Sequence, residues 1–391
     1  MKMKQIFIVL SLFIGVFVVG ADSFIISPLL PTIAQNFHAS IAQTALGVTA
    51  YALCEMLGAP LFGPFGDRFS KRKLLLTGIG IFLIGTLLCA LATNLATFYL
   101  YRAIAGLGAA LFLPNVWAFI GSYFSGKTHA ETNRMNKIMG IVMAALSLSV
   151  ALGVPLGSFL AQLSNWHMAF WASAILTACA ALVILLVLPD TPTTAQKISY
   201  LQNFKQVFST KGALRALVIS LFYMFAFYLV YTFLGSFLTV TFHLSLGQRG
   251  LVFFLYGVAN FIGAIFGGAV MNRLGRVRSI LMNAALSALF VLGLGLLGSQ
   301  LPILLIFLIL LALSMGLGVT AISAYIVSIA PQNRSTLMSF NSSVLYLGLT
   351  IGSSLGGLLF QNIGFWSLAT VSAVAFLTAA VMVMTMQRSA K

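Results

Sequence analysis

The chain reads Gly63-Pro64-Phe65-Gly66-Asp67-Arg68-Phe69-Ser70-Lys71-Arg72-Lys73 between two apolar runs, residues 43–64 and 74–94. Each run is close to the roughly 20 residues that a helix needs to cross the hydrocarbon core of a bilayer. Long apolar runs and short charged breaks alternate along the whole chain, of which 60% is hydrophobic and 7% is charged. A water-soluble fold has no interior large enough to bury so much apolar surface, so we expect an integral membrane protein.

The apolar runs predict helices rather than strands. Backbone amide groups in lipid must be hydrogen-bonded within their own segment, and the runs are too long for the strands of a membrane barrel. We therefore expect an all-α integral membrane protein with twelve transmembrane helices. The expected helices lie near residues 5–27, 43–64, 74–94, 97–122, 138–161, 168–188, 213–241, 250–271, 279–299, 301–329, 336–360 and 365–387.

The placement of the basic residues predicts the orientation in the membrane. If the N-terminus is cytoplasmic and the helices alternate, all but two of the 21 lysine and arginine residues fall at the inner face. The exceptions are Arg249, in an outer loop, and Arg102, within a helix. This asymmetry is the positive-inside signature, which puts both termini in the cytoplasm. It also accounts for the net charge of +16 without nucleic acid as a partner.

A long polar stretch after the sixth run divides the chain into two halves. Residues 1–188 are expected to form an N-terminal six-helix bundle, and residues 213–391 a C-terminal one. Residues 189–212, which begin Pro-Asp-Thr-Pro, have the composition of a cytoplasmic linker between the bundles.

Three pairs of matching segments support this division and predict internal pseudo-symmetry. The members of each pair occupy the same helix position in their halves. The pairs are 63–73 with 268–278, Gly106-Leu-Gly108 with Gly316-Leu-Gly318, and Gly153-x-x-x-Gly157 with Gly352-x-x-x-Gly356. Internal repeats are typical of secondary transporters, whose substrate site lies between the halves near the bilayer midplane.

Residues 63–73 resemble the signature loop between helices 2 and 3 of the major facilitator superfamily, with Ser70 at a position that is usually glycine. Arg102-x-x-x-Gly106-x-Gly108 is similar to a second motif of that family. Gly153-x-Pro155-x-Gly157 resembles the helix 5 motif of its twelve-helix drug:proton antiporter branch, with a spacing more like the sugar, purine and arabinose-type efflux permeases. The resemblance covers the whole chain and implies a secondary transporter of the bacterial cytoplasmic membrane.

Two groups of residues are candidates for gating. A carboxylate at the cytoplasmic end of helix 2 can pair with basic residues or a helix N-terminus of the other half and latch one conformation. Glycine and proline let helix 5 bend and let another helix approach closely, although simple close packing explains them equally well. The gating candidates are Asp67, Arg68, Arg72, Gly153, Pro155 and Gly157.

Two of the five acids, Asp22 and Glu55, lie inside apolar runs. Low-dielectric surroundings favour the protonated form of a carboxyl group, so these two are candidates for binding and releasing protons. From the helical rise, Asp22 lies about 24 Å above the inner end of helix 1 and Arg102 about 7 Å below the outer end of helix 4, which puts the two level. We expect Asp22, Glu55 and Arg102 to couple transport to protons. The structural alternatives are an interface position for Asp22, an interhelical hydrogen bond for Glu55 and an ion pair for Arg102.

Aromatic and amide side chains are scattered through the apolar runs, most densely in the seventh. Aromatic walls with few fixed donors suit an apolar, planar or cationic small molecule. Packing or contact with lipid is the alternative for each residue. The expected substrate-binding residues are Tyr51, Asn115, Tyr223, Phe227, Tyr231, Tyr256, Asn260, Asn341 and Tyr346.

We predict a monomeric transporter that exports small amphipathic or drug-like compounds in exchange for protons by alternating access. The alternatives are efflux of a sugar or purine metabolite, and proton-symport uptake, which needs the same carboxylates. A channel would be distinguished by currents beyond the turnover of a carrier. The sequence has no nucleophile elbow, metal-ligand cluster or P-loop, so we expect neither an enzyme nor an ATP-driven pump, and no cofactor.

Overall fold

The computed structural model describes residues 3–62, 65, 69–124, 129–190, 205, 209, 212–329 and 334–389. Every regular element in this part of the chain is a helix. Twelve segments of the described residues are long and apolar enough to cross a membrane, and α6, η1 and α7 share one of them, Lys137–Leu163. The expected all-α, twelve-helix membrane protein is thereby confirmed. The elements are α1 (Met3–Asn36), α2 (Ile41–Phe62), α4 (Lys71–Cys89), α5 (Leu95–Tyr123), α6 (His129–Leu148), the π-helix η1 (Ser149–Gly153), α7 (Val154–Leu163), α8 (His167–Val187), α10 (Ala213–Phe242), α11 (Leu246–Leu274), α12 (Arg276–Leu297), α13 (Leu301–Ile329), α14 (Arg334–Asn362) and α15 (Phe365–Ser389).

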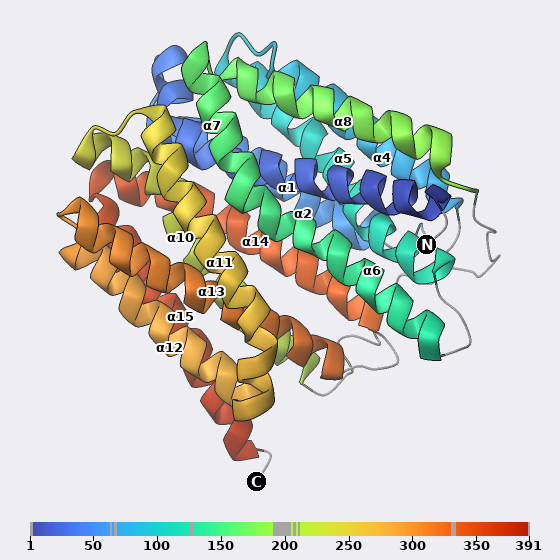
Figure 1. Cartoon of the computed structure of the whole chain (residues 1–391). Coiled ribbons are helices and arrows are strands. Elements are labelled where there is room, and N and C mark those ends of the chain that lie inside the picture. Colours follow the sequence, from blue (N-terminus) through green and yellow to red (C-terminus); the bar gives the residue numbers. More distant parts are fainter. Residues whose placement is uncertain are drawn as a thin grey trace.

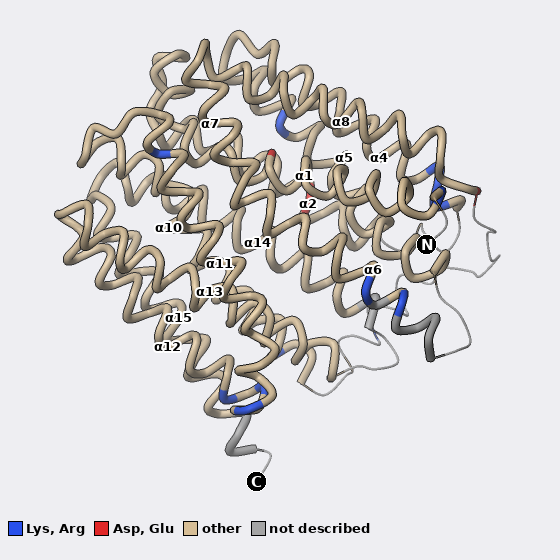
Figure 2. Tube along the Cα trace, in the orientation of Figure 1, with Lys and Arg blue, Asp and Glu red and all other residues tan. Residues whose placement is uncertain are grey.

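The helices form two halves that lie side by side, α1 to α8 in one and α10 to α15 in the other (Figure 1). Both chain ends lie at the same end of the molecule (Figure 1). The lysine and arginine positions of the described residues gather at that end of the Cα trace, with few elsewhere (Figure 2). We call it the basic end, defined by Lys71, Arg215 and Arg276 at the starts of α4, α10 and α12, and the opposite end the far end. Most of the predicted linker, 189–212, lies outside the described residues.

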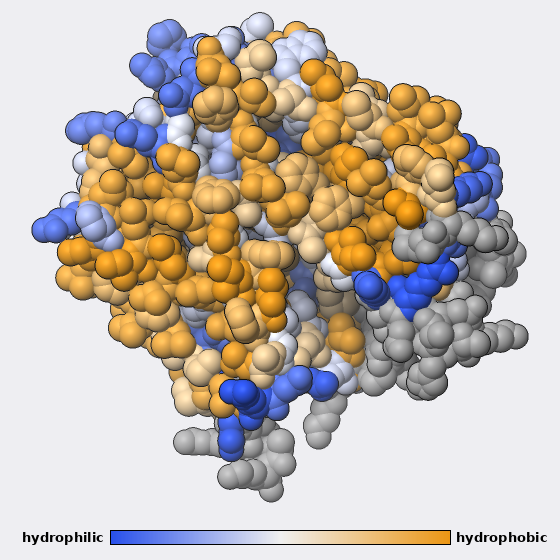
Figure 3. Space-filling view, viewed as in Figure 1, coloured by the Kyte–Doolittle hydropathy of each residue, from blue (hydrophilic) through white to orange (hydrophobic). Residues whose placement is uncertain are grey.

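The face of the molecule seen in Figure 3 is largely apolar over both halves. Large side chains such as Leu186, Leu251 and Val374 are exposed on it. A continuous apolar surface of this extent is unfavourable in water, and it is favourable against the hydrocarbon of a bilayer.

The loops at the basic end explain one difference between the two matching segments. Ser70 precedes α4 with φ −55°, and its side chain caps the helix by accepting a hydrogen bond from the Lys73 amide. Gly275, at the corresponding place before α12, has φ +82°, a conformation that favours glycine. The first half thus starts its helix with a side-chain cap, and the second half with a glycine at positive φ.

Hydrogen bonds join the two halves at the far end. Ser27 of α1 donates to the Tyr231 carbonyl of α10 over 2.5 Å. Thr49 of α2 and Ser353 of α14 share a hydrogen bond of 2.8 Å. Gly235 of α10 lies directly against the Ser27 carbonyl, an approach that a β-carbon would prevent. These contacts close the far end of the interface in this conformation.

The fifth membrane-spanning segment, made of α6, η1 and α7, is interrupted at η1, a π-helix at Ser149–Gly153. A π-helical turn is one of the identified causes of a bend, and the segment lies between α1 and α11. On one side, Gly153 and Gly157 pack against α1 of their own half. On the other side, the backbone of Ala151 lies against Gly257 of α11, so the glycine that permits close contact between the halves here belongs to α11.

We expect Gly257→Ala to destabilise the protein, because the new β-carbon would overlap the Ala151 backbone. Overpacking of this kind costs about 1–3 kcal/mol. The midpoint of thermal unfolding of the purified protein should fall. Gly268→Ala on the same helix is the matched control, since its β-carbon would meet no described heavy atom within 4 Å. Equal effects of the two substitutions would contradict the contact.

Candidate functional site

The site is built around the stretch of α1 that contains Pro28 and Pro31, both inside the helix. Proline has no amide hydrogen, so the carbonyl groups four residues earlier, those of Phe24 and Ser27, lose their helical partners. Both residues line a small pocket between the halves, together with Val48 of α2 and Tyr228 of α10. The expected first helix ended near residue 27, whereas α1 continues to Asn36.

A buried ion pair lies just before this stretch. Arg102 of α5 donates from Nη1 to Oδ2 of Asp22, and the two residues are 0% and 1% exposed. The Arg102 guanidinium also lies 4.3 Å from the centre of the Tyr51 ring, and the Tyr51 hydroxyl accepts a hydrogen bond from Ser23. The equal depth of Asp22 and Arg102 expected from the helical rise agrees with this contact.

Glu55 of α2 is the second buried carboxyl group, 1% exposed. The hydroxyl groups of Tyr51 and of Tyr346, which belongs to α14 of the other half, lie close to it. Its Oε2 atom has no hydrogen-bond partner, and Glu55 forms no salt bridge with a described residue. Asp22 is therefore neutralised by a cation. Glu55 instead faces two neutral phenols, Tyr51 of its own half and Tyr346 across the boundary between the halves.

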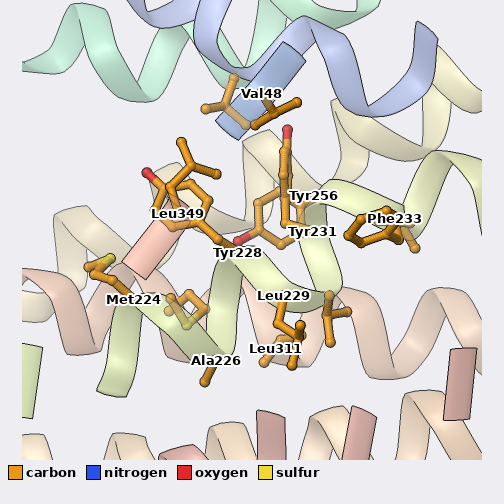
Figure 4. Packing of buried hydrophobic residues seen from close by; sticks show 14 of the residues in the cluster. Val48, Met224, Ala226, Tyr228, Leu229, Tyr231, Phe233, Tyr256, Leu311 and Leu349 are labelled. Atoms are coloured by element: carbon orange, nitrogen blue, oxygen red, sulfur yellow. The ribbon is translucent and has the colours of Figure 1, made fainter. Parts of the chain in front are cut away.

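The structure brings three of the expected substrate-binding residues together in the C-terminal half. Phe227 and Tyr231 of α10 have ring centres 5.0 Å apart, and Tyr231 lies 5.3 Å from Tyr256 of α11. Figure 4 shows Tyr228, Tyr231 and Tyr256 gathered near Val48 of the opposite half. This aromatic cluster and Glu55 therefore both lie at the boundary between the halves.

The other six residues of the expected substrate-binding set already have partners in the protein, and for all but Tyr346 the partner lies in the same half. Tyr51 packs on Arg102 as described, and Tyr346 lies by Glu55. The remaining four bond within a half: Asn115 to the Leu111 carbonyl, Tyr223 to the Ser314 carbonyl, Asn260 to the Ala312 carbonyl, and Asn341 to the Ser220 hydroxyl. Hydrogen bonds of this kind position helices and leave these groups less available to a ligand.

The gating candidates are only partly described. Asp67 and Arg68 lie outside the described residues. Arg72 donates to the Leu185 carbonyl near the end of α8, within its own half. Pro155 of α7 lies beside Gly250 of α11, in the contact between the two halves.

Arg249 is a functional candidate that the sequence analysis missed. The positive-inside argument placed it in an outer loop, but it lies in the first turn of α11 and is 5% exposed. Its guanidinium donates to the Pro28 carbonyl over 2.6 Å and approaches the Thr32 hydroxyl at 3.4 Å. The signal in the sequence was its isolation, since a lone cation at the uncharged end of a membrane protein needs a buried partner.

No group of three histidine, cysteine, aspartate or glutamate side chains in the described part of the chain could hold a metal ion. The chemistry available at the boundary is therefore that of two carboxyl groups, two arginines, phenols and aromatic rings. These groups can bind protons and small molecules by charge, hydrogen bonds and stacking.

Comparisons with known proteins agree with this arrangement. The family model of the Major Facilitator Superfamily matches residues 12–298 and 216–390. The chain is 30% identical to the uncharacterized MFS-type transporter YceJ of Bacillus subtilis (strain 168), over 96% of this chain and 95% of that protein. It is 26% identical to multidrug resistance protein 2 of the same organism, over 92% of this chain and 90% of that protein. The partially occluded inward-open structure of the xylose transporter XylE from E. coli has the same fold, with a TM-score of 0.77 at 15% identity, over 96% of this chain and 97% of that chain.

We expect Arg102→Met to lower the stability strongly, because it leaves the Asp22 carboxylate buried without its cation. Removing one partner of a buried ion pair costs about 3–5 kcal/mol. The double variant Asp22→Asn with Arg102→Met should recover most of the loss, as thermal unfolding in detergent would measure. A double variant as unstable as Arg102→Met alone would show that Arg102 acts through packing instead.

Arg249→Gln should weaken closure of the far end, because it removes a charged donor to the Pro28 carbonyl. A hydrogen bond with a charged group contributes about 1.5–3 kcal/mol. Spin labels at His38→Cys and His243→Cys, both exposed at the far end, would report the distance between the halves in a background without the native cysteines.

The distance distribution should shift to longer values in Arg249→Gln. The control is Arg273→Gln, which removes an exposed arginine at the other end of α11 and should leave the distribution unchanged. An unchanged distribution in Arg249→Gln would rule out a role in closure.

Proposed function

The chain belongs to the Major Facilitator Superfamily of membrane transporters, and on this premise we propose that it exports small amphipathic or drug-like compounds in exchange for protons. The transport of small molecules across a membrane follows from the family. Coupling to protons, outward direction and class of substrate are the proposed parts. The observation that carries proton coupling is the presence of two buried carboxyl groups, Asp22 and Glu55, of which only Asp22 is paired with a cation, Arg102.

The charge balance among Asp22, Glu55 and Arg102 favours binding of one proton. Asp22 and Arg102 neutralise each other, and Glu55 adds one negative charge when ionised. An uncompensated charge is costly in low-dielectric surroundings. Protonation of either carboxyl group makes the cluster of Asp22, Glu55 and Arg102 neutral. Release of the proton requires water, which reaches the cluster only when the halves part on one side.

Alternating access provides that change in exposure. In the conformation described here the far end is closed by contacts of Arg249 with Pro28 and of Ser27 with Tyr231. In the proposed cycle these contacts break when the halves rock, and the cluster and the aromatic residues become exposed to the far side. Tyr346 belongs to the C-terminal half, and its hydroxyl group lies beside the Glu55 carboxyl group of the N-terminal half. In the proposed cycle, movement of the halves therefore changes the surroundings of the group that binds the proton.

The proposed outward direction rests on a relative. The relatives of the chain include multidrug resistance protein 2, whose name denotes resistance to several drugs. By the positive-inside rule the basic end is cytoplasmic, so the closed far end faces outward. We propose that it acts as a monomer in the cytoplasmic membrane.

Glu55→Gln should abolish substrate-induced proton movement, because glutamine keeps the shape of the side chain but cannot bind and release a proton. Proteoliposomes containing a pH-sensitive dye would be given a panel of lipophilic cations, uncharged aromatic compounds, purines and sugars. Asp22→Asn should have the same effect. Asp190→Asn is the matched control, because this carboxyl group is exposed at the end of α8, and its signal should equal that of the unmodified protein.

The sign of the dye signal separates export from symport. Outward substrate movement with inward proton movement supports the proposal, and parallel movement of both would replace it with proton-coupled uptake. Full proton signals in both Glu55→Gln and Asp22→Asn would remove the two carboxyl groups from the mechanism.

A further inference from the structure

The small pocket between the halves lies nearer the far end than Glu55 does. Val48 of α2 lines it, about two helical turns before Glu55 on a helix that runs toward the basic end. The residues with hydroxyl groups that line the pocket are Ser23 and Ser27 of α1 and Tyr228, Tyr231 and Thr232 of α10. The pocket has room for about one water molecule, and a site of this size holds water where polar groups line it. A single water molecule is therefore the occupant that fits the pocket.

Two hydroxyl groups connect this pocket to Glu55. Ser23, a lining residue, donates from its hydroxyl to the Tyr51 hydroxyl of α2 over 3.0 Å. Tyr51 precedes Glu55 by one turn of α2, and its hydroxyl lies within reach of a side-chain hydrogen bond to the Glu55 carboxyl group. An ionised carboxyl group can only accept, so Tyr51 is the donor in that contact. Both hydrogen bonds therefore point the same way, from the pocket toward Glu55.

The other groups around Glu55 provide less direct routes for a proton. The nearby charged groups are Asp22 and Arg102, which are bonded to each other. Tyr346 lies beside Glu55 from α14 but is not among the lining residues of the pocket. Tyr228 lines the pocket and lies near Glu55, so it is the competing route. Ser23 is favoured over Tyr228 because its hydrogen bond to Tyr51 is already formed in this conformation.

We propose that Ser23 and Tyr51 form a proton relay that carries a proton from water in the pocket to Glu55. A hydronium ion in the pocket gives a proton to the Ser23 oxygen, Ser23 gives its own proton to the Tyr51 oxygen, and Tyr51 gives its own to the Glu55 carboxylate. One O–H bond breaks and one forms at each step, which leaves water, neutral serine, neutral tyrosine and a protonated Glu55. This inference rests on the proposed proton coupling through Glu55 and adds the route by which the proton arrives.

The surroundings of Ser23 also allow the relay to reset. After each transfer the hydroxyl groups must turn back before they can pass another proton. The Ser23 oxygen lies 3.0 Å from the Val19 carbonyl as well as 3.0 Å from the Tyr51 hydroxyl. A serine hydroxyl has one hydrogen and rotates to suit its acceptors. Ser23 can therefore hold its hydrogen on Val19 while it accepts from the water, and then turn to Tyr51.

The test measures how fast Glu55 takes up a proton, in full-length protein in lipid nanodiscs without substrate. A laser flash releases a caged proton, and infrared spectroscopy follows the C=O stretching band of protonated Glu55, identified as the band that Glu55→Gln lacks. Ser23→Ala should slow the rise of this band by about a hundredfold, the lower end of what a positioned proton donor contributes. Its final amplitude and the pH of half-protonation should stay unchanged, because Ser23 bonds to Tyr51 and not to the carboxyl group. Tyr51→Phe should slow the rise as well.

Ser11→Ala is the matched control, because this buried serine of α1 donates to the Ile8 carbonyl, and its rate should equal that of the unmodified protein. An unchanged rate in both Ser23→Ala and Tyr51→Phe would overturn the relay. A slow rise in Tyr228→Phe with a normal rise in Ser23→Ala would assign the route to Tyr228 and overturn it too. Either result with an intact Glu55 band leaves the proposed function standing. A protein in which Glu55→Gln removes no band would overturn the relay together with the role of Glu55 in coupling.

Discussion

A lipid bilayer offers backbone groups no hydrogen-bond partner, and this constraint governs where the chain can depart from regular helix. In α1, Pro28 and Pro31 leave the carbonyl groups of Phe24 and Ser27 without helical partners. Such groups are tolerated only inside the protein or along a cavity, and the Ser27 carbonyl lies against Gly235 of the other half. Arg249 donates to the neighbouring Pro28 carbonyl from the same side. The proline-containing stretch of α1 is therefore also a place where the two halves are held together.

The same low dielectric makes buried charge costly, so the three charged side chains beside that stretch require an explanation. Asp22 and Arg102 satisfy each other, and the Tyr51 ring covers the guanidinium. The Tyr51 hydroxyl also lies near Glu55, which connects the ion pair to the carboxyl group without a cation. The Asp22–Arg102 pair alone would be enough to stabilise the packing of the helices, and that role does not require Glu55. The added acid makes the charge of the cluster depend on one proton, at a boundary that moves in the proposed cycle.

Run length predicted the twelve helices because the bilayer sets their length, and helical rise predicted that Asp22 and Arg102 lie level. Neither argument gives the rotation of a helix about its axis, because helices surrounded by lipid and protein are apolar on every side. Asn341 and Tyr223 were therefore expected at the substrate and instead bond to Ser220 and Ser314. The burial of Arg249 was missed because the positive-inside rule assigns a residue to one side of the membrane and says nothing of its burial. The π-helix η1, between α6 and α7, has no signature in the sequence beyond the nearby glycines and proline.

The two halves share their fold and motifs but divide the polar chemistry unequally. The N-terminal half holds both buried acids and their arginine, whereas the C-terminal half has no acid and carries the aromatic cluster of Phe227, Tyr231 and Tyr256. A proton and a substrate that occupy different groups do not compete for one carboxylate. Their coupling must then pass through contacts between the halves, those of Tyr346 with Glu55 and of Tyr231 with Ser27. The Tyr231 carbonyl accepts a hydrogen bond from Ser27 of α1, and the Tyr231 side chain lines the small pocket between the halves. A ligand that moves Tyr231 therefore acts on the closure of the far end directly, without a longer path through the bundle.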